Sequence, residues 1–110
     1  MLSKQNRADK KQIKQIFKEG RFLNSPNLTF KYIKNSSQLL LPTQISFIAP
    51  KSVAKLAVKR NLLRRRGYAA LKKYFNQFPS GLKGAFIFKK PINSILEIEN
   101  EIKTILYKIN

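Results

Sequence analysis

Acidic side chains are missing from the whole middle of the chain, from residue 20 to residue 96. The carboxylates lie only toward the two ends, at Asp9, Glu19, Glu97, Glu99 and Glu101. With 23 Lys and Arg against 5 Asp and Glu, the formal net charge is +18, so the positive side chains repel one another. A compact fold must spread these charges over its surface, and binding of a polyanion would relieve the repulsion.

The length and composition favour a single folded domain over residues 1–110, because two cores would each be too small. Hydrophobic residues make up 43% of the chain, including eight Phe and four Tyr, which is enough to fill a core. The absence of Cys and His excludes disulfides, thiol nucleophiles, imidazole bases and the usual zinc sites. No apolar stretch is long enough to cross a bilayer, so we expect a soluble, cytoplasmic protein with no membrane partner.

The first third of the chain predicts a short helix followed by a hairpin. Asp9 and Gln12 have the spacing of a helix capping box, and Gly20 is placed to end the helix. Residues 21–24 and 28–33 alternate in polarity around a Ser-Pro-Asn break, which predicts two antiparallel strands.

The middle of the chain predicts a third strand and a long helix. A polar turn at residues 35–38 and the apolar residues 39–41 precede a strand at residues 44–49, which Pro50 ends. Residues 56–76 have helical periodicity, and their apolar stripe should meet the sheet, with Gly67 allowing close approach of a bulky neighbour. The residues of this stripe are Leu63, Gly67, Leu71, Tyr74 and Phe78.

The last third predicts a buried strand at residues 84–88 and a final helix that starts with a capping box of Ser94 and Glu97. The expected core stripe of that helix is Ile95, Ile98, Ile102, Ile105 and Ile109. The element order is therefore αβββαβα. This order predicts an α+β fold, a two-layer α/β sandwich in which helices pack on a four-stranded sheet.

Residues 51–73 form the candidate binding segment, with nine Lys or Arg and no acid. Like charges on adjacent turns destabilise an isolated helix by a few tenths of a kcal/mol per pair, roughly, so the sequence favours an external phosphate backbone as the compensating partner. RNA is the favoured polyanion, with DNA and an anionic lipid surface as alternatives. Asn61, a poor helix former, is either a polar contact or an exposed residue without a role. The candidate RNA-binding residues are Lys51, Lys55, Lys59, Arg60, Asn61, Arg64 and Arg65.

The segment AVKRNLLRR resembles the signature at the start of the basic helix in the bacterial ribonuclease P protein family. The matching positions are Ala57, Val58, Arg60, Asn61, Arg64 and Arg65. Three further blocks resemble the family in the same order along nearly the whole chain, at residues 16–20, 50–53 and 86–91. One departure is Leu62, which stands where the signature has its second Arg.

The resemblance implies the non-catalytic protein subunit of an endoribonuclease, with ribonuclease P RNA and the 5′ leader of precursor tRNA as partners and no protein partner. It implies that Mg²⁺ is held by the RNA, and that the crossover through the basic helix is left-handed. It also implies a leader cleft between the first helix and the sheet. The residues expected there are Ile13, Phe17, Lys31 and Tyr32, with Thr29 as a further candidate.

Two alternatives stay open at this point. Phe17 has helical spacing and is either a core residue or a stacking platform for single-stranded RNA. A ribosomal or architectural RNA-binding protein with no processing role would have the same composition. For the ribonuclease P interpretation we expect Arg60 and Arg65 to contact the catalytic RNA and not to hold the fold, so that changing both to Ala leaves thermal stability unchanged or slightly raised.

Overall fold

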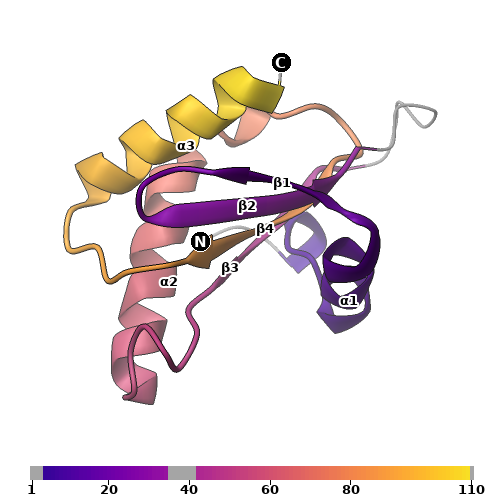
Figure 1. Cartoon of the computed structure of the whole chain (residues 1–110). Helices are drawn as coiled ribbons and strands as arrows, with labels where there is room; N and C mark the ends of the chain where they lie inside the picture. Colours follow the sequence, from indigo (N-terminus) through magenta and orange to yellow (C-terminus); the bar gives the residue numbers. More distant parts are fainter. Residues whose placement is uncertain (1–3, 35–41, 110) are drawn as a thin grey trace.

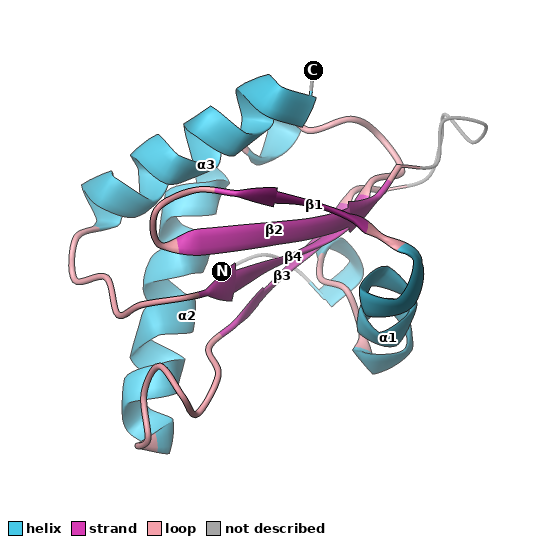
Figure 2. Ribbon diagram, in the orientation of Figure 1, coloured by secondary structure: helices cyan, strands magenta, loops and turns pink. Residues whose placement is uncertain are grey.

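A four-stranded sheet organises the fold (Figures 1 and 2). The computed structural model describes residues 4–34 and 42–109. Within them the predicted order αβββαβα is confirmed, while the predicted turn at 35–38 and the apolar residues 39–41 lie outside the described residues. The elements are η1 (Lys4–Asn6), α1 (Lys10–Glu19), β1 (Arg21–Asn24), β2 (Leu28–Ile33), β3 (Gln44–Ile48), α2 (Ala57–Lys72), η2 (Phe75–Gln77), β4 (Lys83–Phe88) and α3 (Ile95–Ile109).

The strands lie in the order β1-β2-β4-β3, which leaves β1 and β3 at the edges. The pairs β1/β2 and β2/β4 are antiparallel, whereas β3 and β4 are parallel and are joined through α2. In Figure 1, β3 and β4 run toward the same side with α2 behind them, so this connection has the left-handed sense that the resemblance implied. Parallel crossovers are right-handed in nearly all other folds.

The ends of α1 follow the predicted caps. The Asp9 carboxylate accepts the Gln12 backbone N–H at 2.9 Å, and the Gln12 side chain accepts the Asp9 backbone N–H at 2.9 Å. At the other end, the Gly20 N–H donates to the Ile16 carbonyl at 2.8 Å. Local hydrogen bonds therefore define the ends of this helix. None of the described helices is long and apolar enough to span a membrane.

The helix α2 ends earlier than predicted, at Lys72, and a 3₁₀ turn over Phe75–Gln77 replaces its last turn. The Tyr74 N–H donates to the Leu71 carbonyl at 2.9 Å, which tightens the backbone at this point. The turn directs Phe78 into the core, where its ring meets those of Phe30 and Phe86 edge-on at 5.9 and 6.3 Å.

The core stripe of α3 differs from the prediction at Ile95, which is 43% exposed because contact of the helix with the core begins only at Ile98. A buried carboxylate, Glu101, lies within the stripe instead. It accepts hydrogen bonds from the Ser25 hydroxyl at 2.5 Å, the Asn27 backbone N–H at 2.7 Å and the Asn27 amide at 2.8 Å. These bonds attach the β1–β2 turn to α3 and satisfy the buried charge.

The register of the strands assigns each side chain to one face of the sheet. Leu23, Phe30, Phe86 and Phe47 are neighbours in one row, and their face packs against α2 and α3. The rings of Phe30 and Phe86 stack at 4.3 Å, and those of Phe86 and Phe47 at 5.0 Å. The opposite face carries α1, which covers only part of it (Figure 1).

Gly67 lies where α2 crosses β3, and the predicted close approach of a bulky neighbour is confirmed. A Cβ at this position would lie 2.5 Å from Cδ1 of Phe47 and 2.8 Å from its Cγ. Phe47 is almost fully buried and cannot move away freely. The helix therefore reaches the sheet only because this position has no side chain.

We expect Gly67→Ala to lower the free energy of unfolding by up to about 2 kcal/mol, because overpacking against Phe47 costs about 1–3 kcal/mol and outweighs the ~1 kcal/mol gain in helix propensity. Urea denaturation measures the change. Ala69→Gly, at an exposed position of the same helix, is the control for propensity and should cost about 1 kcal/mol. A more stable Gly67→Ala variant would contradict this description of the α2–β3 contact.

Candidate nucleic-acid interface

The predicted basic residues line the N-terminal half of α2 and the loop before it. Lys51, Lys55, Lys59, Asn61, Arg64 and Arg65 are all exposed. The helix has no acidic residue in its first turn, and the N-cap residue Leu56 makes no side-chain capping bond. This end of α2 is therefore strongly cationic, and its backbone N–H groups add to the positive potential.

Arg60 differs from its basic neighbours because it is half-buried and makes contacts with the fold. Its Nη1 donates to the backbone carbonyl of Lys55 at 2.7 Å and to that of Ala54 at 3.0 Å. These bonds hold the loop before α2 against the helix. The expectation that neither arginine holds the fold conflicts with these contacts of Arg60, and it stays a prediction for Arg65, which is exposed.

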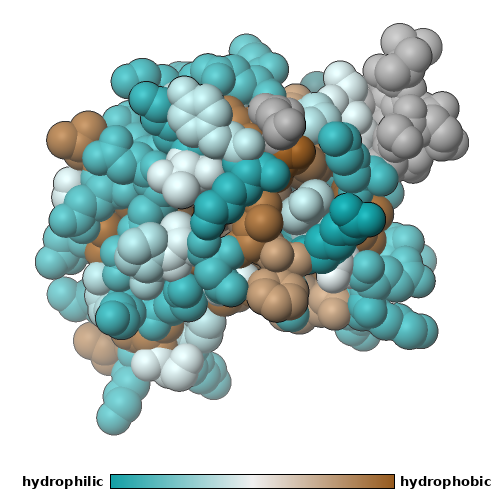
Figure 3. All heavy atoms as spheres, turned by 45° about the horizontal axis from the view of Figure 1, so that its top comes forward, coloured by the Kyte–Doolittle hydropathy of each residue, from teal (hydrophilic) through white to brown (hydrophobic). Residues whose placement is uncertain are grey.

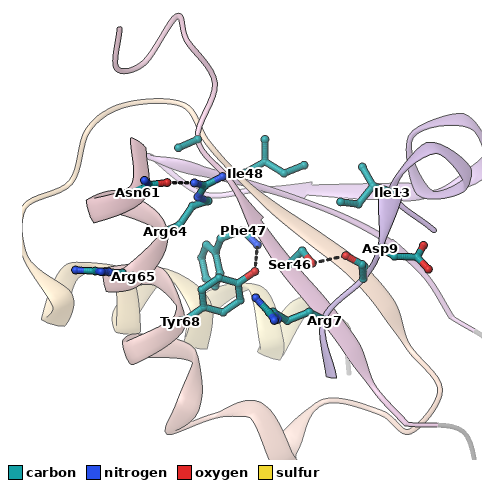
Figure 4. A pocket seen from close by; sticks show the side chains of 12 residues that line it. Arg7, Asp9, Ile13, Ser46, Phe47, Ile48, Asn61, Arg64, Arg65 and Tyr68 are labelled. Carbon is teal, nitrogen blue, oxygen red and sulfur yellow. Dashed lines mark hydrogen bonds between the residues drawn. The ribbon is translucent and has the colours of Figure 1, made fainter. Parts of the chain in front are cut away.

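A groove of about 730 Å³ runs along the edge strand β3, between α2 and the start of α1 (Figure 4). We call it the edge groove. Asn61 and Arg64 form part of its rim, and the Asn61 amide oxygen accepts a hydrogen bond from Nη2 of Arg64. The groove is lined by Arg7, Ala8, Asp9, Ile13, Ser46, Phe47, Ile48, Ala49, Asn61, Arg64, Arg65 and Tyr68.

Hydrogen bonds to the edge strand shape the floor of the edge groove. The Tyr68 hydroxyl accepts the Phe47 backbone N–H at 3.2 Å, which covers a group that would otherwise face solvent at a sheet edge. The Ser46 hydroxyl donates to the Ala8 carbonyl at 2.8 Å and fixes the segment before α1. Arg7 projects between them (Figure 4), and its buried Nε has no hydrogen-bond partner among the described residues. Arg7 therefore adds a cation to the edge groove, and the sequence did not indicate this contribution.

A second cluster lies on the face of the sheet that carries α1. Phe22, Lys31, Ala85 and Ser46 are neighbours in one row across the four strands, so their side chains share this face. The Lys31 ammonium lies 4.7 Å from the centre of the Phe17 ring, within the range of a cation–π contact. Phe17 is 46% exposed and Phe22 is 62% exposed. We call Phe17, Phe22 and Lys31 the aromatic face.

The structure does not place Tyr32, which was expected in the leader cleft, in this cluster. Strand side chains alternate between the two faces, so Tyr32 lies opposite to Lys31. It is 9% exposed, and its ring stacks on Phe30 at 5.4 Å within the core. Ile13 and Thr29 are half-buried, and Ile13 lines the edge groove one turn before Phe17.

Sequence reasoning missed Phe22, Arg7 and Tyr68. Phe22 could have been found from strand pairing, because the short hairpin places it directly opposite Lys31. Arg7 and Tyr68 could not be found from the sequence, because only the packing of α1 and α2 around β3 brings them together. Candidate site residues thus come from segments that are far apart in the sequence.

The described carboxylates do not form a metal site. Residues 4–34 and 42–109 contain no group of three or more Asp and Glu side chains that could hold a metal ion. Asp9 caps α1, and Glu101 is held by Ser25 and Asn27. What the site offers chemically is cationic groups and aromatic rings, which suit phosphates and nucleobases.

Comparison with known proteins identifies similar chains. The family model of ribonuclease P matches residues 2–110. The RNase P protein of Staphylococcus aureus has a similar structure, with a TM-score of 0.78 at 15% identity, covering 98% of this chain and 97% of that chain. The RNase P protein of Thermotoga maritima has a TM-score of 0.78 at 18% identity, covering 94% and 97%. These two similarities show that the chain shares the fold of those proteins. No curated protein sequence matches this chain significantly.

Arg60 and Arg65 should differ in their effect on stability. We expect Arg60→Ala to lower the free energy of unfolding by about 1–2 kcal/mol, because two hydrogen bonds to backbone carbonyls are lost. Arg65→Ala should change it by no more than about 0.5 kcal/mol, as is usual for an exposed side chain. Urea denaturation of the two variants measures the difference, and equal losses would show that the contacts of Arg60 do not hold the loop.

Proposed function

The chain belongs to the ribonuclease P protein family, and on that premise we propose that it binds the catalytic RNA and the 5′ leader of precursor tRNA in the cytoplasm. The family places it in an endoribonuclease complex that processes tRNA. In the proposal the RNA subunit performs the hydrolysis, and the protein holds RNA and substrate in position. The observation that carries it is the presence of a cationic groove and an exposed aromatic cluster around the same helix, α1.

The edge groove and the exposed flank of α2 are the proposed contact with the catalytic RNA. Arg64 and Arg65 extend from α2, Arg7 extends from the segment before α1, and the groove between them is open to a phosphate backbone. Arginine binds phosphate with two parallel N–H groups, which gives orientation as well as charge. Asn61 orients Arg64 through its side-chain amide, which gives this poor helix former a defined role.

The aromatic face is the proposed contact with the leader. Single-stranded RNA stacks its bases on aromatic rings without needing a fixed sequence, which suits a subunit that serves many precursors. Phe17 and Phe22 supply exposed rings, and Lys31 supplies a cation beside them. On the side drawn in Figure 3 the surface is mainly hydrophilic with small apolar patches, as expected for a protein that binds a polar polymer.

Metal-dependent hydrolysis does not fit the protein's own side chains. Because no three of the described carboxylates come together, we assign Mg²⁺ to the phosphates of the RNA. The protein's cations would then reduce the phosphate repulsion that Mg²⁺ otherwise has to screen. A ribosomal or architectural protein would bind RNA through the same groove, but it would not stimulate the cleavage of precursor tRNA.

Affinity for ribonuclease P RNA should fall steeply with salt, because binding releases counterions from the RNA. For roughly six phosphate contacts, the slope of log K against log salt should be about −4 to −5, at ~0.7 per phosphate for single strands. Filter binding or fluorescence anisotropy over a range of KCl concentrations measures it. A slope shallower than about −1 would exclude phosphate neutralisation as the main source of affinity.

The protein should stimulate cleavage more for precursor tRNA with a leader of several nucleotides than for precursor tRNA with almost none. The benefit should shrink as Mg²⁺ is raised, and Phe17→Ala should remove about fivefold or more of the long-leader advantage, because a base loses its stacking surface. The measurement is the cleavage rate by ribonuclease P RNA over a Mg²⁺ titration, with and without protein.

Tyr107→Ala is the matched control, because Tyr107 is an exposed aromatic residue at 71% exposure on α3, away from the aromatic face. It should leave the stimulation unchanged. Equal stimulation of both substrates by the unmodified protein would refute the leader contact. Cleavage by the protein in the absence of RNA would refute the assignment of hydrolysis to the RNA.

A further inference from the structure

A second, smaller groove of about 310 Å³ lies on the other flank of α2. We call it the flank groove. Leu62 on the helix, Val53 in the preceding loop and Pro91 in the segment after β4 line it, and Lys59 and Arg66 lie at its rim. Its volume is at the lower end of the range for sites that enclose a small ligand. None of its residues belongs to the edge groove.

The spacing along α2 separates the two grooves. Lys59, Leu62 and Arg66 are three and four residues apart, so they share one side of the helix. Arg64, which lines the edge groove, lies nearly half a turn away around the helix axis. The same cationic helix therefore has a groove on each side.

Arg66 is fixed in the wall of the flank groove. Its Nη1 donates to the Ile92 carbonyl at 3.4 Å and to the Asn93 amide oxygen at 3.3 Å. A guanidinium has five N–H groups, so these two bonds engage only part of its donors. Leu62 is 38% exposed beside it, so part of its side chain is open to a ligand in the groove.

We propose that the flank groove receives an unpaired nucleobase of the bound RNA. The base would lie against Leu62 and Pro91, and the phosphates on either side of it would meet Lys59 and Arg66. The inference rests on the proposed RNA-binding function and adds a base-contacting site to it. Leu62 stands where the family signature has an arginine, so this position would offer the base an apolar contact in place of a charged one.

The charge around the groove favours RNA over a peptide. The rim is cationic, Lys89 and Lys90 immediately precede Pro91, and no acidic residue occurs between residues 20 and 96. An apolar peptide would have to bring the necessary negative charge, whereas RNA has a phosphate beside every base. An apolar slot beside cations offers a nonpolar surface to the base and opposite charge to its phosphates.

The test compares binding of RNA, which has bases, with binding of linear polyphosphate, which has none. Affinities for ribonuclease P RNA and for linear polyphosphate are measured for the unmodified protein, Leu62→Ser, Pro91→Ala and Val58→Ser. Val58 is the matched control, since it is 69% exposed on the same helix and lies outside both grooves. We expect Leu62→Ser to weaken RNA binding about five- to tenfold, with polyphosphate binding and the salt dependence unchanged.

Pro91→Ala, on the opposite wall, should also weaken RNA binding and leave polyphosphate binding unchanged. The test therefore does not depend on the folding of a single variant. Equal affinities of Leu62→Ser, Pro91→Ala and Val58→Ser for the RNA would overturn the base-binding site. A loss of self-association in Leu62→Ser by sedimentation, with RNA affinity unchanged, would overturn it in favour of a protein contact. With either of these two outcomes, stimulation of precursor tRNA cleavage by the unmodified protein would still support the proposed function. Only the base-binding role of the flank groove would then be refuted.

Discussion

The placement of the basic helix depends on the contact between Phe47 and one turn of α2. The Phe47 ring lies against the bare backbone of Gly67, meets the Tyr68 ring edge-on at 5.2 Å and stacks on Phe86 at 5.0 Å. Its backbone N–H is capped by the Tyr68 hydroxyl. Because one side chain joins the edge strand, the helix and the sheet interior, a shift of α2 would disturb all three. The cationic residues of α2 are held in place by this apolar contact.

The charge of the chain is separated from its core. The stacked aromatic side chains of the core occupy one face of the sheet, and most lysines and arginines of α2 lie on its exposed flanks. Among the carboxylates, Asp9 and Glu101 serve the fold as a helix cap and as the anchor of the β1–β2 turn. The cations consequently have few internal partners, which leaves them to a polyanion.

The secondary structure could be predicted well because its signals are local. The capping box of α1 and the strand β2 have the predicted residues, since each depends on side chains a few positions apart. The prediction was wrong where distant packing decides the outcome. Helix α2 ends at Lys72 because Phe78 turns into the core, and Ile95 stays exposed because α3 meets the core only from Ile98.

The sequence by itself determined that the chain is cationic, which segment carries the basic helix and which caps and turns delimit the elements, because composition and short-range patterns set these properties. Only the tertiary structure decided which side of the sheet each side chain faces. It moved Tyr32 into the core, paired Phe22 with Lys31 and turned Arg60 toward the loop. Strand register and helix crossing depend on contacts between residues far apart in the chain, and local pattern does not encode such contacts.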